Sequence, residues 1–317
     1  MSQVSLGRLG FGAAGIGNLY RAVDDAAAQA TVESAWDGGI RYFDTAPHYG
    51  LGLSERRLGL ALRGKPRDEF LVSTKVGRLL VPALNTESAR DDEGFDVPAD
   101  LRRVWDPTEA GIRRSLEESL DRLGLDRVDI LYLHDPDAYD LEAGITQALP
   151  AMEKLRAEGL VKAIGVGSNS SDALVKCVQR SELDLVMLAG RYTLLEQPAP
   201  EQLLPACIER GVGVVNVGVY NSGLLARPTI SDDAHYNYAP APQKILDHAR
   251  QLAACCAEYG VELPTAALQF SLLHPAVRTV VVGASNPAQI KQNIARINQP
   301  VPEELWEELR RRSLVPA

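Results

Sequence analysis

The feature that most constrains the fold is a regular alternation of short apolar runs with longer amphipathic segments along the 317-residue chain. Several of the apolar runs are continuous rather than alternating, which is typical of parallel strands that are covered on both faces. Runs of strand length occur at residues 8–12, 41–43, 70–74, 128–133, 161–166, 183–188, 212–217 and 279–282.

Helical periodicity fills the intervals between these runs, and repeated strand–helix units predict a parallel sheet. Because eight such units close more naturally into a barrel than into an open sheet, we expect an α/β fold, a (β/α)8 TIM barrel forming one domain over residues 1–317. An open, doubly wound sheet is the alternative. The expected helices span residues 25–37, 54–63, 107–123, 142–158, 171–180, 201–209, 263–273 and 302–312.

Two long insertions interrupt this rhythm, at residues 77–106 and 226–242, and the second contains the aromatic run from His235 to Tyr238. Each insertion follows a strand. Loops after strands lie on the C-terminal face of a barrel, where active sites are found, so we expect both to cover a substrate. A surface excursion without order is the alternative.

Four polar residues mark the C-terminal ends of three consecutive expected strands. Asp44, Lys75 and His134 each follow or end a strand, and Tyr49 lies five residues after Asp44. Singly, a strand-end aspartate is often a helix cap and a histidine is often structural. Together they meet on one face of the barrel, and the sequence therefore predicts a catalytic group there.

The residue types suit proton transfer. A tyrosine has an ordinary pKa near 10 and carries protons poorly at neutral pH unless a cation lowers that pKa, and Lys75 can supply the charge. Asp44 would hold Lys75 and compensate its burial. His134 would orient the substrate oxygen through a ring nitrogen, and which nitrogen carries the proton stays open.

On these residues the chain resembles the aldo-keto reductase family. The resemblance lies in FDTAPHYG at residues 43–50, STKVG at 73–77 and DILYLHD at 129–135, and it extends over nearly the whole chain. It implies a nicotinamide-dependent oxidoreductase in which Asp44, Tyr49, Lys75 and His134 match the family's catalytic tetrad, with Tyr49 as the proton donor or acceptor.

Within the family, LSERRLGLAL at 53–62 and GRYTLLEQ at 190–197 are most similar to bacterial aldose 1-dehydrogenases, including L-fucose dehydrogenase. L-galactose dehydrogenase and pyridoxal 4-dehydrogenase are similar as well. The likeness implies oxidation of an aldose of the L-fucose, L-galactose or D-arabinose type at C1. Alternatives are a carbonyl reductase that uses NADPH, a pyridoxal dehydrogenase, and a regulatory subunit that binds the cofactor without turnover.

The segment GASNPAQIKQN at residues 283–293 predicts a cofactor site, because Asn286 and Pro287 are typical of a helix start and helix N-termini bind anions. An ordinary capped helix is the alternative. Relatives that take NADP carry cations at the positions of Gly283 and Gln289, so the resemblance favours NAD over NADP. The expected cofactor-binding residues here are Gly283, Ser285, Asn286, Gln289, Gln292 and Asn293.

At the nicotinamide end, the resemblance implies that Ser168 and Asn169 bind the carboxamide. The chain departs from the family at two positions: Ala189 replaces a frequent glutamine, and Val217 replaces the aromatic residue that often stacks on nicotinamide.

Composition limits the partners. With a net charge of −9 the chain lacks the basic patches that bind nucleic acid or anionic membranes, so a small neutral substrate fits better, and the resemblance implies that this partner is a sugar. The chain shows neither a leader-like N-terminus nor a long apolar run, so we expect a cytoplasmic protein. The cysteines lack the spacing of a metal site, so no metal is expected. The expected substrate contacts are Tyr20, His48, Trp105 and Asp135.

Overall fold

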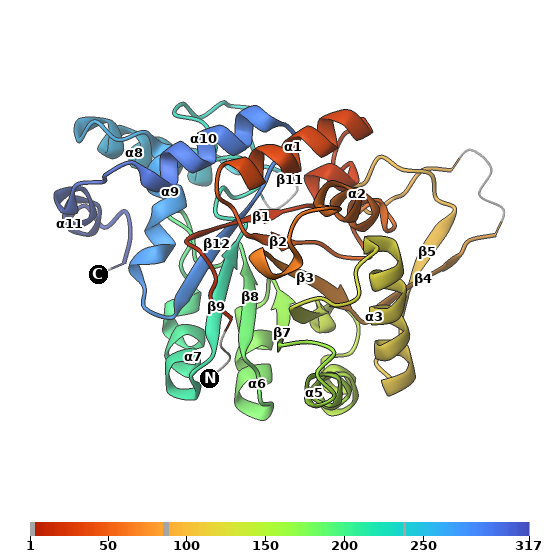
Figure 1. Cartoon of the computed structure of the whole chain (residues 1–317). Helices are drawn as coiled ribbons and strands as arrows, with labels where there is room; N and C mark the ends of the chain where they lie inside the picture. The colour runs from red at the N-terminus through yellow and green to blue at the C-terminus, as the bar shows by residue number, and fades with distance from the viewer. Residues whose placement is uncertain (1–3, 85–88, 237–238, 317) are drawn as a thin grey trace.

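The computed structural model describes residues 4–84, 89–236 and 239–316, and at its centre eight parallel strands close into a barrel (Figure 1). The predicted TIM barrel is therefore confirmed. Pairing of the last strand with the first closes the ring. In order around the barrel, the strands are β1 (Leu9–Gly12), β2 (Tyr42–Asp44), β3 (Leu71–Val76), β6 (Ile130–His134), β7 (Ala163–Ser168), β8 (Leu185–Ala189), β9 (Gly213–Val217) and β12 (Val277–Gly283).

Helices surround the strands, and each turns an apolar side inward, as the buried Leu174, Cys177 and Val178 of α6 illustrate. The segment expected as one helix at 142–158 contains α4 (Leu141–Ala143), a π-helical turn at Gly144–Ala148 and α5 (Leu149–Ala157). The other expected helices are present as α1 (Asp25–Asp37), α2 (Leu53–Leu62), α3 (Glu109–Leu123), α6 (Ser171–Arg180), α7 (Leu203–Arg210), α9 (Leu263–Phe270), α10 (Pro287–Asn298) and α11 (Glu303–Arg311).

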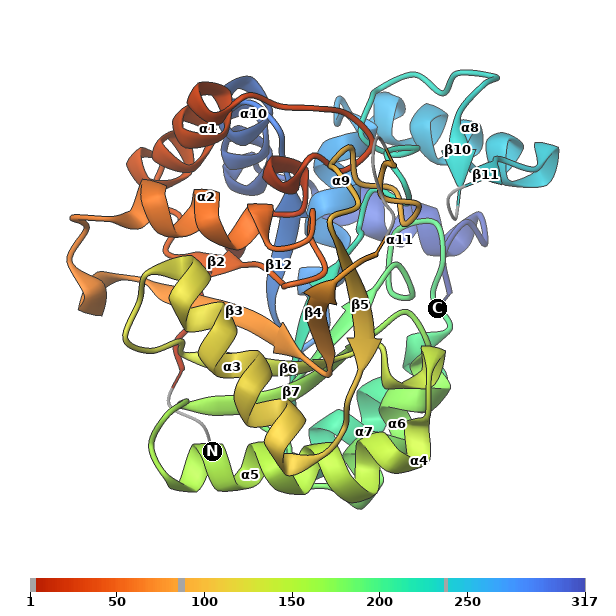
Figure 2. The same ribbon diagram turned by 90° about the vertical axis from the view of Figure 1, so that its right-hand side faces the viewer.

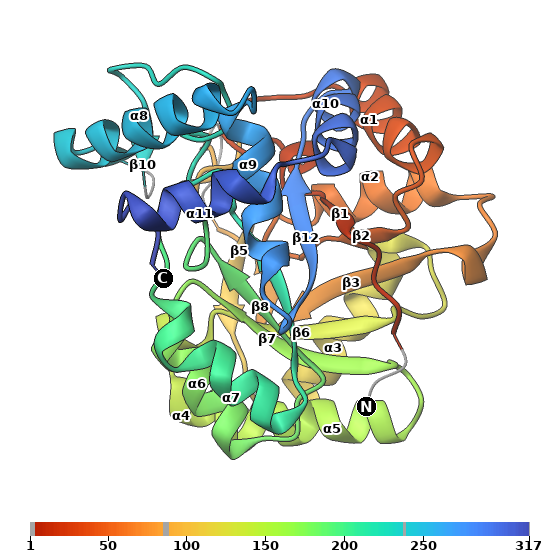
Figure 3. The same cartoon turned by 90° about the vertical axis from the view of Figure 1, so that its left-hand side faces the viewer.

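One helix was missing from the prediction: α8 (Gln243–Glu258), which lies beside α11 at the outside of the barrel (Figure 3). Its buried side chains Leu246, Ala249, Leu252 and Cys256 recur at helical spacing. The helical period of this segment was therefore visible in the sequence. In the part of the chain that the structure describes, no helix is long and apolar enough to cross a membrane.

The interior of the barrel is filled by side chains in layers, because alternate residues of a strand point to the same face. Tyr42, Ile130, Tyr132 and Met187 belong to one buried interior cluster. Two residues further along their strands, the same period turns Asp44 and His134 inward at the C-terminal end. The lower layer thus supports the polar upper one.

Both long insertions form hairpins on the C-terminal side. Residues 77–106 contain the antiparallel strands β4 (Arg78–Pro82) and β5 (Leu101–Trp105), which stand in front of the barrel in Figure 2. The alternative of an excursion without order is wrong for the described part of this insertion. The second insertion contains the short pair β10 (His235–Tyr236) and β11 (Ala239–Pro240), and Tyr238 lies outside the described residues.

Glycines in β1 and in the turn that follows it allow close packing and do not form the phosphate-binding turn of an open dinucleotide-binding sheet. Gly10, Gly12 and Gly15 have the spacing of a dinucleotide fingerprint, but a short 3-10 turn follows them where that fingerprint requires an α-helix. An added Cβ at Gly15 would lie 2.7 Å from the carbonyl oxygen of Ala284. The open-sheet alternative is therefore wrong.

Candidate active site

The four residues of the predicted tetrad converge at the C-terminal mouth of the barrel. Neighbouring strands β2 and β3 bring Asp44 and Lys75 together, with 2.7 Å between Asp44 Oδ2 and Lys75 Nζ. Lys75 Nζ is 3.1 Å from the hydroxyl of Tyr49, which the loop after β2 supplies. The ring of His134 meets that of Tyr49 edge to face, with centroids 6.0 Å apart.

All three N–H groups of the Lys75 ammonium are engaged in hydrogen bonds. The ammonium donates to Asp44 Oδ2, to the carbonyl oxygen of Thr45 and to the hydroxyl of Tyr49, which uses all three N–H groups. The side chain is only 2% exposed. Because Tyr49 accepts from Lys75, its own proton points elsewhere and is available to a substrate oxygen.

The charges around Tyr49 oppose one another. Burial raises the pKa of the Tyr49 phenol, Lys75 lowers it and Asp44 raises it, and the net pKa lies above its ordinary value. Lys75 thus lowers this pKa as the sequence suggests, but in the protein alone burial and the charge of Asp44 outweigh its effect. Burial lowers the pKa of Lys75, but Asp44 and Tyr49 outweigh burial, so the ammonium stays charged.

Two histidines at the mouth are neutral. Burial, followed by the charges of Arg78 and Lys75, holds the pKa of His134 well below its ordinary value. Burial, Arg78 and Arg103 lower the pKa of His48 to about 2. Their rings lie edge to face, 5.4 Å apart. A neutral ring at His134 can both donate and accept a hydrogen bond, which suits contact with an alcohol or a carbonyl.

Three of the four predicted substrate contacts gather beside the tetrad. Asp135 Oδ2 is 3.5 Å from His134 Nε2 and 2.5 Å from an amino group of Arg78. Trp105 is paired with Arg78 across the β4–β5 hairpin and stacks on Tyr139, with ring centroids 5.0 Å apart. The sequence analysis did not single out Arg78 or Tyr139.

These substrate candidates retain unused hydrogen-bonding atoms. Nδ1 of His48, Nε1 of Trp105 and Nε of Arg78 are buried without a hydrogen-bond partner in the described structure. Buried polar atoms without partners are costly, so they are expected where a ligand supplies the missing bonds.

A buried ion pair fixes the loop that carries His48. Arg103 of β5 donates to Asp91, with both side chains under 5% exposed, and also to the carbonyl oxygen of His48. The first insertion thereby contacts the backbone of the loop that carries His48 and Tyr49. Neither Asp91 nor Arg103 was expected at the site from the sequence.

The predicted cofactor segment begins as expected. Asn286 caps α10 by accepting from the backbone N–H of Gln289 at 3.0 Å, and Gln292 is exposed. Two amides are already engaged: Gln289 Oε1 accepts from Ser285 N at 2.8 Å, and Asn293 Oδ1 accepts from the hydroxyl of Tyr220 at 2.9 Å. Those bonds hold the segment together, and the amide N–H groups of Gln289 and Asn293 remain available to a ligand.

A cation also reaches this segment from outside it. The guanidinium of Arg21, in the loop before α1, donates to the hydroxyl of Ser285 at 2.7 Å. Arg21 was not among the cations expected near this segment from the sequence.

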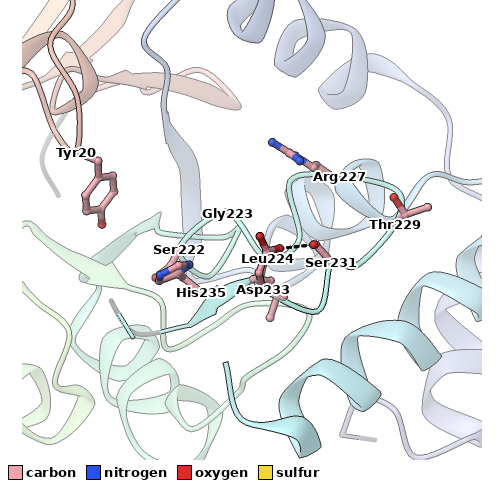
Figure 4. A pocket seen from close by; sticks show the side chains of 10 residues that line it. Tyr20, Ser222, Gly223, Leu224, Arg227, Thr229, Ser231, Asp233 and His235 are labelled. Carbon is pink, nitrogen blue, oxygen red and sulfur yellow. Dashed lines mark hydrogen bonds between the residues drawn. The ribbon is translucent and has the colours of Figure 1, made fainter. Parts of the chain in front are cut away.

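The fourth predicted substrate contact, Tyr20, lies beside the first insertion, because its backbone N–H donates to the carbonyl oxygen of Gly94 at 2.9 Å. Its ring lines a cavity of about 650 Å³ between the loop after β1 and the loop after β9, and this cavity is lined by none of the tetrad (Figure 4). Arg227 and His235 line the same cavity. Two hydrogen bonds connect the loops on either side of this cavity with the predicted cofactor segment, one from Arg21 to Ser285 and one from Tyr220 to Asn293. The substrate contact expected of Tyr20 stays a prediction.

At the nicotinamide end, Ser168 ends β7 and Val217 ends β9, with β8 between them, and Asn169 is exposed after β7. Ser168 Oγ donates to Asp137 at 2.7 Å and accepts from Ser170 N at 2.9 Å. A hydroxyl has one further acceptor position, so Ser168 can accept from an amide N–H of a ligand.

Comparison with known proteins gives the class of this site. The profile of the Aldo/keto reductase family matches residues 8–312. The chain belongs to the aldo-keto reductase family, and it is an oxidoreductase.

Individual relatives narrow the comparison. The chain is 56% identical over 312 residues to D-threo-aldose 1-dehydrogenase from Pseudomonas sp, covering 97% of this chain and 94% of that protein. It is 38% identical over 326 residues to pyridoxal 4-dehydrogenase from Microbacterium luteolum, covering 97% and 94%. The holo form of aldo-keto reductase AKR11C1 from Bacillus halodurans has a similar fold, with a TM-score of 0.76 and 28% identity over 100% of this chain and 95% of that one.

Proposed function

We propose that this protein is an NAD-dependent aldose 1-dehydrogenase, which oxidises a cyclic aldose of the L-fucose, L-galactose or D-arabinose type to its lactone. The observation that carries the chemistry is the 3.1 Å hydrogen bond from Lys75 to Tyr49, beside the neutral His134. The choice of an aldose is supported by the 56% identity to D-threo-aldose 1-dehydrogenase.

In the reaction we propose, the C1 hydroxyl of the sugar meets Tyr49 and His134. Tyr49 takes the hydroxyl proton, and the Lys75 ammonium stabilises the phenolate that must precede this transfer. His134 binds the same oxygen and keeps it in reach of Tyr49. A bound NAD would supply the acceptor for the hydride from C1, so the overall products would be the lactone, NADH and a proton.

The substrate end of the site suits a polyhydroxylated ring. Asp135 offers its second carboxylate oxygen as an acceptor, while His48 and Trp105 offer unpartnered nitrogens. Sugar hydroxyls donate and accept, so they can satisfy both kinds of group. The stacked Trp105 adds an apolar face for the ring.

For the cofactor, we assign the adenosine end to the N-terminal half of α10 and the carboxamide to Ser168 and Asn169. The N-terminus of α10 fits a phosphate-bearing ligand, and the cavity of about 650 Å³ lies between two loops that are hydrogen-bonded to the same segment. Neutral Gly283 and Gln289 favour NAD over NADP. The four buried, free cysteines support a reducing compartment, in keeping with a cytoplasmic enzyme.

A panel of substrates tests this assignment. Purified protein is mixed with NAD and, in turn, L-fucose, L-galactose, D-arabinose, pyridoxal and a simple aliphatic alcohol, and NADH absorbance is followed. NADH formed with an aldose supports the proposal. Turnover of pyridoxal alone would favour the second candidate, a pyridoxal 4-dehydrogenase, which the 38% identity to that enzyme brings into consideration.

A further inference from the structure

A chain of three buried hydroxyls lies directly beneath the tetrad. Ser73 Oγ donates to Asp44 Oδ1 at 2.6 Å, and Ser73 Oγ and the hydroxyl of Tyr42 are 3.0 Å apart. The hydroxyls of Tyr42 and Tyr132 are 3.3 Å apart. All three side chains are at most 1% exposed.

The strand period explains this arrangement. Ser73 lies two residues before Lys75, Tyr42 two before Asp44, and Tyr132 two before His134. Each member of the chain therefore occupies the interior layer immediately below a member of the tetrad.

The protons of this chain have one consistent direction. An ionised carboxylate only accepts hydrogen bonds, so Ser73 gives its single proton to Asp44. Ser73 must then accept from Tyr42, and Tyr42 in turn accepts from Tyr132. Burial raises the pKa of both phenols above the ordinary value, which keeps them protonated as donors. Three O–H dipoles thus point toward Asp44.

We propose that Ser73, oriented by Tyr42 and Tyr132, is a positioning residue that offsets the charge of Asp44 and thereby favours the phenolate of Tyr49. The Asp44 carboxylate raises the pKa of Tyr49, and a dipole pointing at that carboxylate weakens its effect. This role of Ser73 depends on the proposed function in one respect only, which is that Tyr49 accepts a proton from the substrate. The titratable groups that face Tyr49 are Lys75, Asp44, His134, Asp135 and His48.

The test is the rate–pH profile of the intact enzyme in the direction of alcohol oxidation, recorded with whichever alcohol and nicotinamide cofactor the wild type uses. In Ser73→Ala, the rising limb of kcat should move to higher pH by roughly half a unit to one unit, the effect of one net hydrogen bond. Tyr42→Phe should give a smaller shift in the same direction, and Ser73→Thr should restore the wild-type profile.

Ser54→Ala is the matched control, because Ser54 is also a fully buried serine with two side-chain hydrogen bonds, to Thr45 and to the carbonyl oxygen of Ala13, but none to Asp44. Its profile should match the wild type. Cofactor Kd, followed by tryptophan fluorescence, should be unchanged in Ser73→Ala and shows that the variant is folded. Superimposable Ser73→Ala and wild-type profiles would overturn the proposal, as would an equal shift in Ser54→Ala. An enzyme that oxidises pyridoxal and no sugar would refute the aldose assignment and leave this test intact.

Discussion

The guanidinium of Arg78 holds the carboxylate of Asp135 at 2.5 Å, directly beside the ring of His134. Asp135 has a left-handed backbone with φ of 43°, a conformation that favours glycine and costs a few kcal/mol at most in other residues. Arg78 comes from the first insertion and Asp135 from the barrel. The substrate end of the site is therefore completed by a loop that is remote in sequence from the strand it contacts.

Replacement of Tyr49 with Phe should nearly abolish turnover and leave NAD affinity close to that of the wild type. The phenol contributes proton transfer, and general acid–base groups typically contribute ~10²–10⁴-fold in rate. Steady-state kcat and fluorescence-detected NAD binding check the two halves of this prediction. A Phe variant with more than about a tenth of the wild-type kcat would contradict the role given to Tyr49, since that exceeds what the mechanism allows.

The barrel and the tetrad could be predicted because both follow from local patterns. Apolar runs mark the strands, and the strand ends mark the C-terminal face on which Asp44, Lys75 and His134 meet. Arg78 and Arg21 could not be found in this way. Each acts through a contact with a residue far along the chain, Asp135 and Ser285 respectively, and no spacing rule predicts such pairs.

The direction in which the pKa of Tyr49 is shifted could not be predicted from the sequence either. The charge of Lys75 was evident, but how far the packing of the loops buries the Tyr49 phenol was not, and burial outweighs the charge. The layered barrel interior was implicit in the strand period, yet which hydroxyls bond to one another depends on the register between strands.

The cofactor preference should favour NAD, with a higher kcat/KM for NAD than for NADP, and Gln289→Arg should narrow the gap. A charged hydrogen bond to a 2′-phosphate is worth about 1.5–3 kcal/mol, or roughly ten- to a hundredfold. Arg21→Ala is the informative companion, because Arg21 already reaches Ser285. If the unmodified protein used both cofactors equally and Arg21→Ala lost only NADP, the assignment to NAD would fail and Arg21 would be the responsible cation.

Thermal stability should fall as the pH decreases from about 6.5, partly because His48 must remain neutral in the folded protein. Its folded pKa is lowered to about 2, whereas the unfolded chain binds the proton near 6.5. The stabilisation is therefore present above pH ~6.5 and is lost as the pH falls toward the folded pKa. Between neutral and acidic buffer, the Tm of His48→Gln should drop less than that of the wild type. His235→Gln, at an exposed position, should show the same drop in Tm as the wild type. Equal drops in all three proteins would count against this account.

The last prediction concerns discrimination among sugars. A site that binds particular hydroxyls should distinguish C2, C3 and C4 epimers strongly and tolerate changes at C6, because an inverted hydroxyl leaves buried polar groups unpaired. Asp135→Asn keeps the shape of the side chain but removes the charge that Arg78 holds, so it should reduce kcat/KM for the best aldose by roughly ten- to a hundredfold. The ratio between epimers should shrink at the same time, while oxidation of a simple aliphatic alcohol, where the wild type catalyses it, should change little.

Asp140→Asn is the matched control, since Asp140 is an exposed aspartate nearby whose side chain caps α4. Equal kcat/KM for all epimers in the wild type, or an undiminished epimer ratio in Asp135→Asn, would show that Asp135 does not bind the sugar hydroxyls.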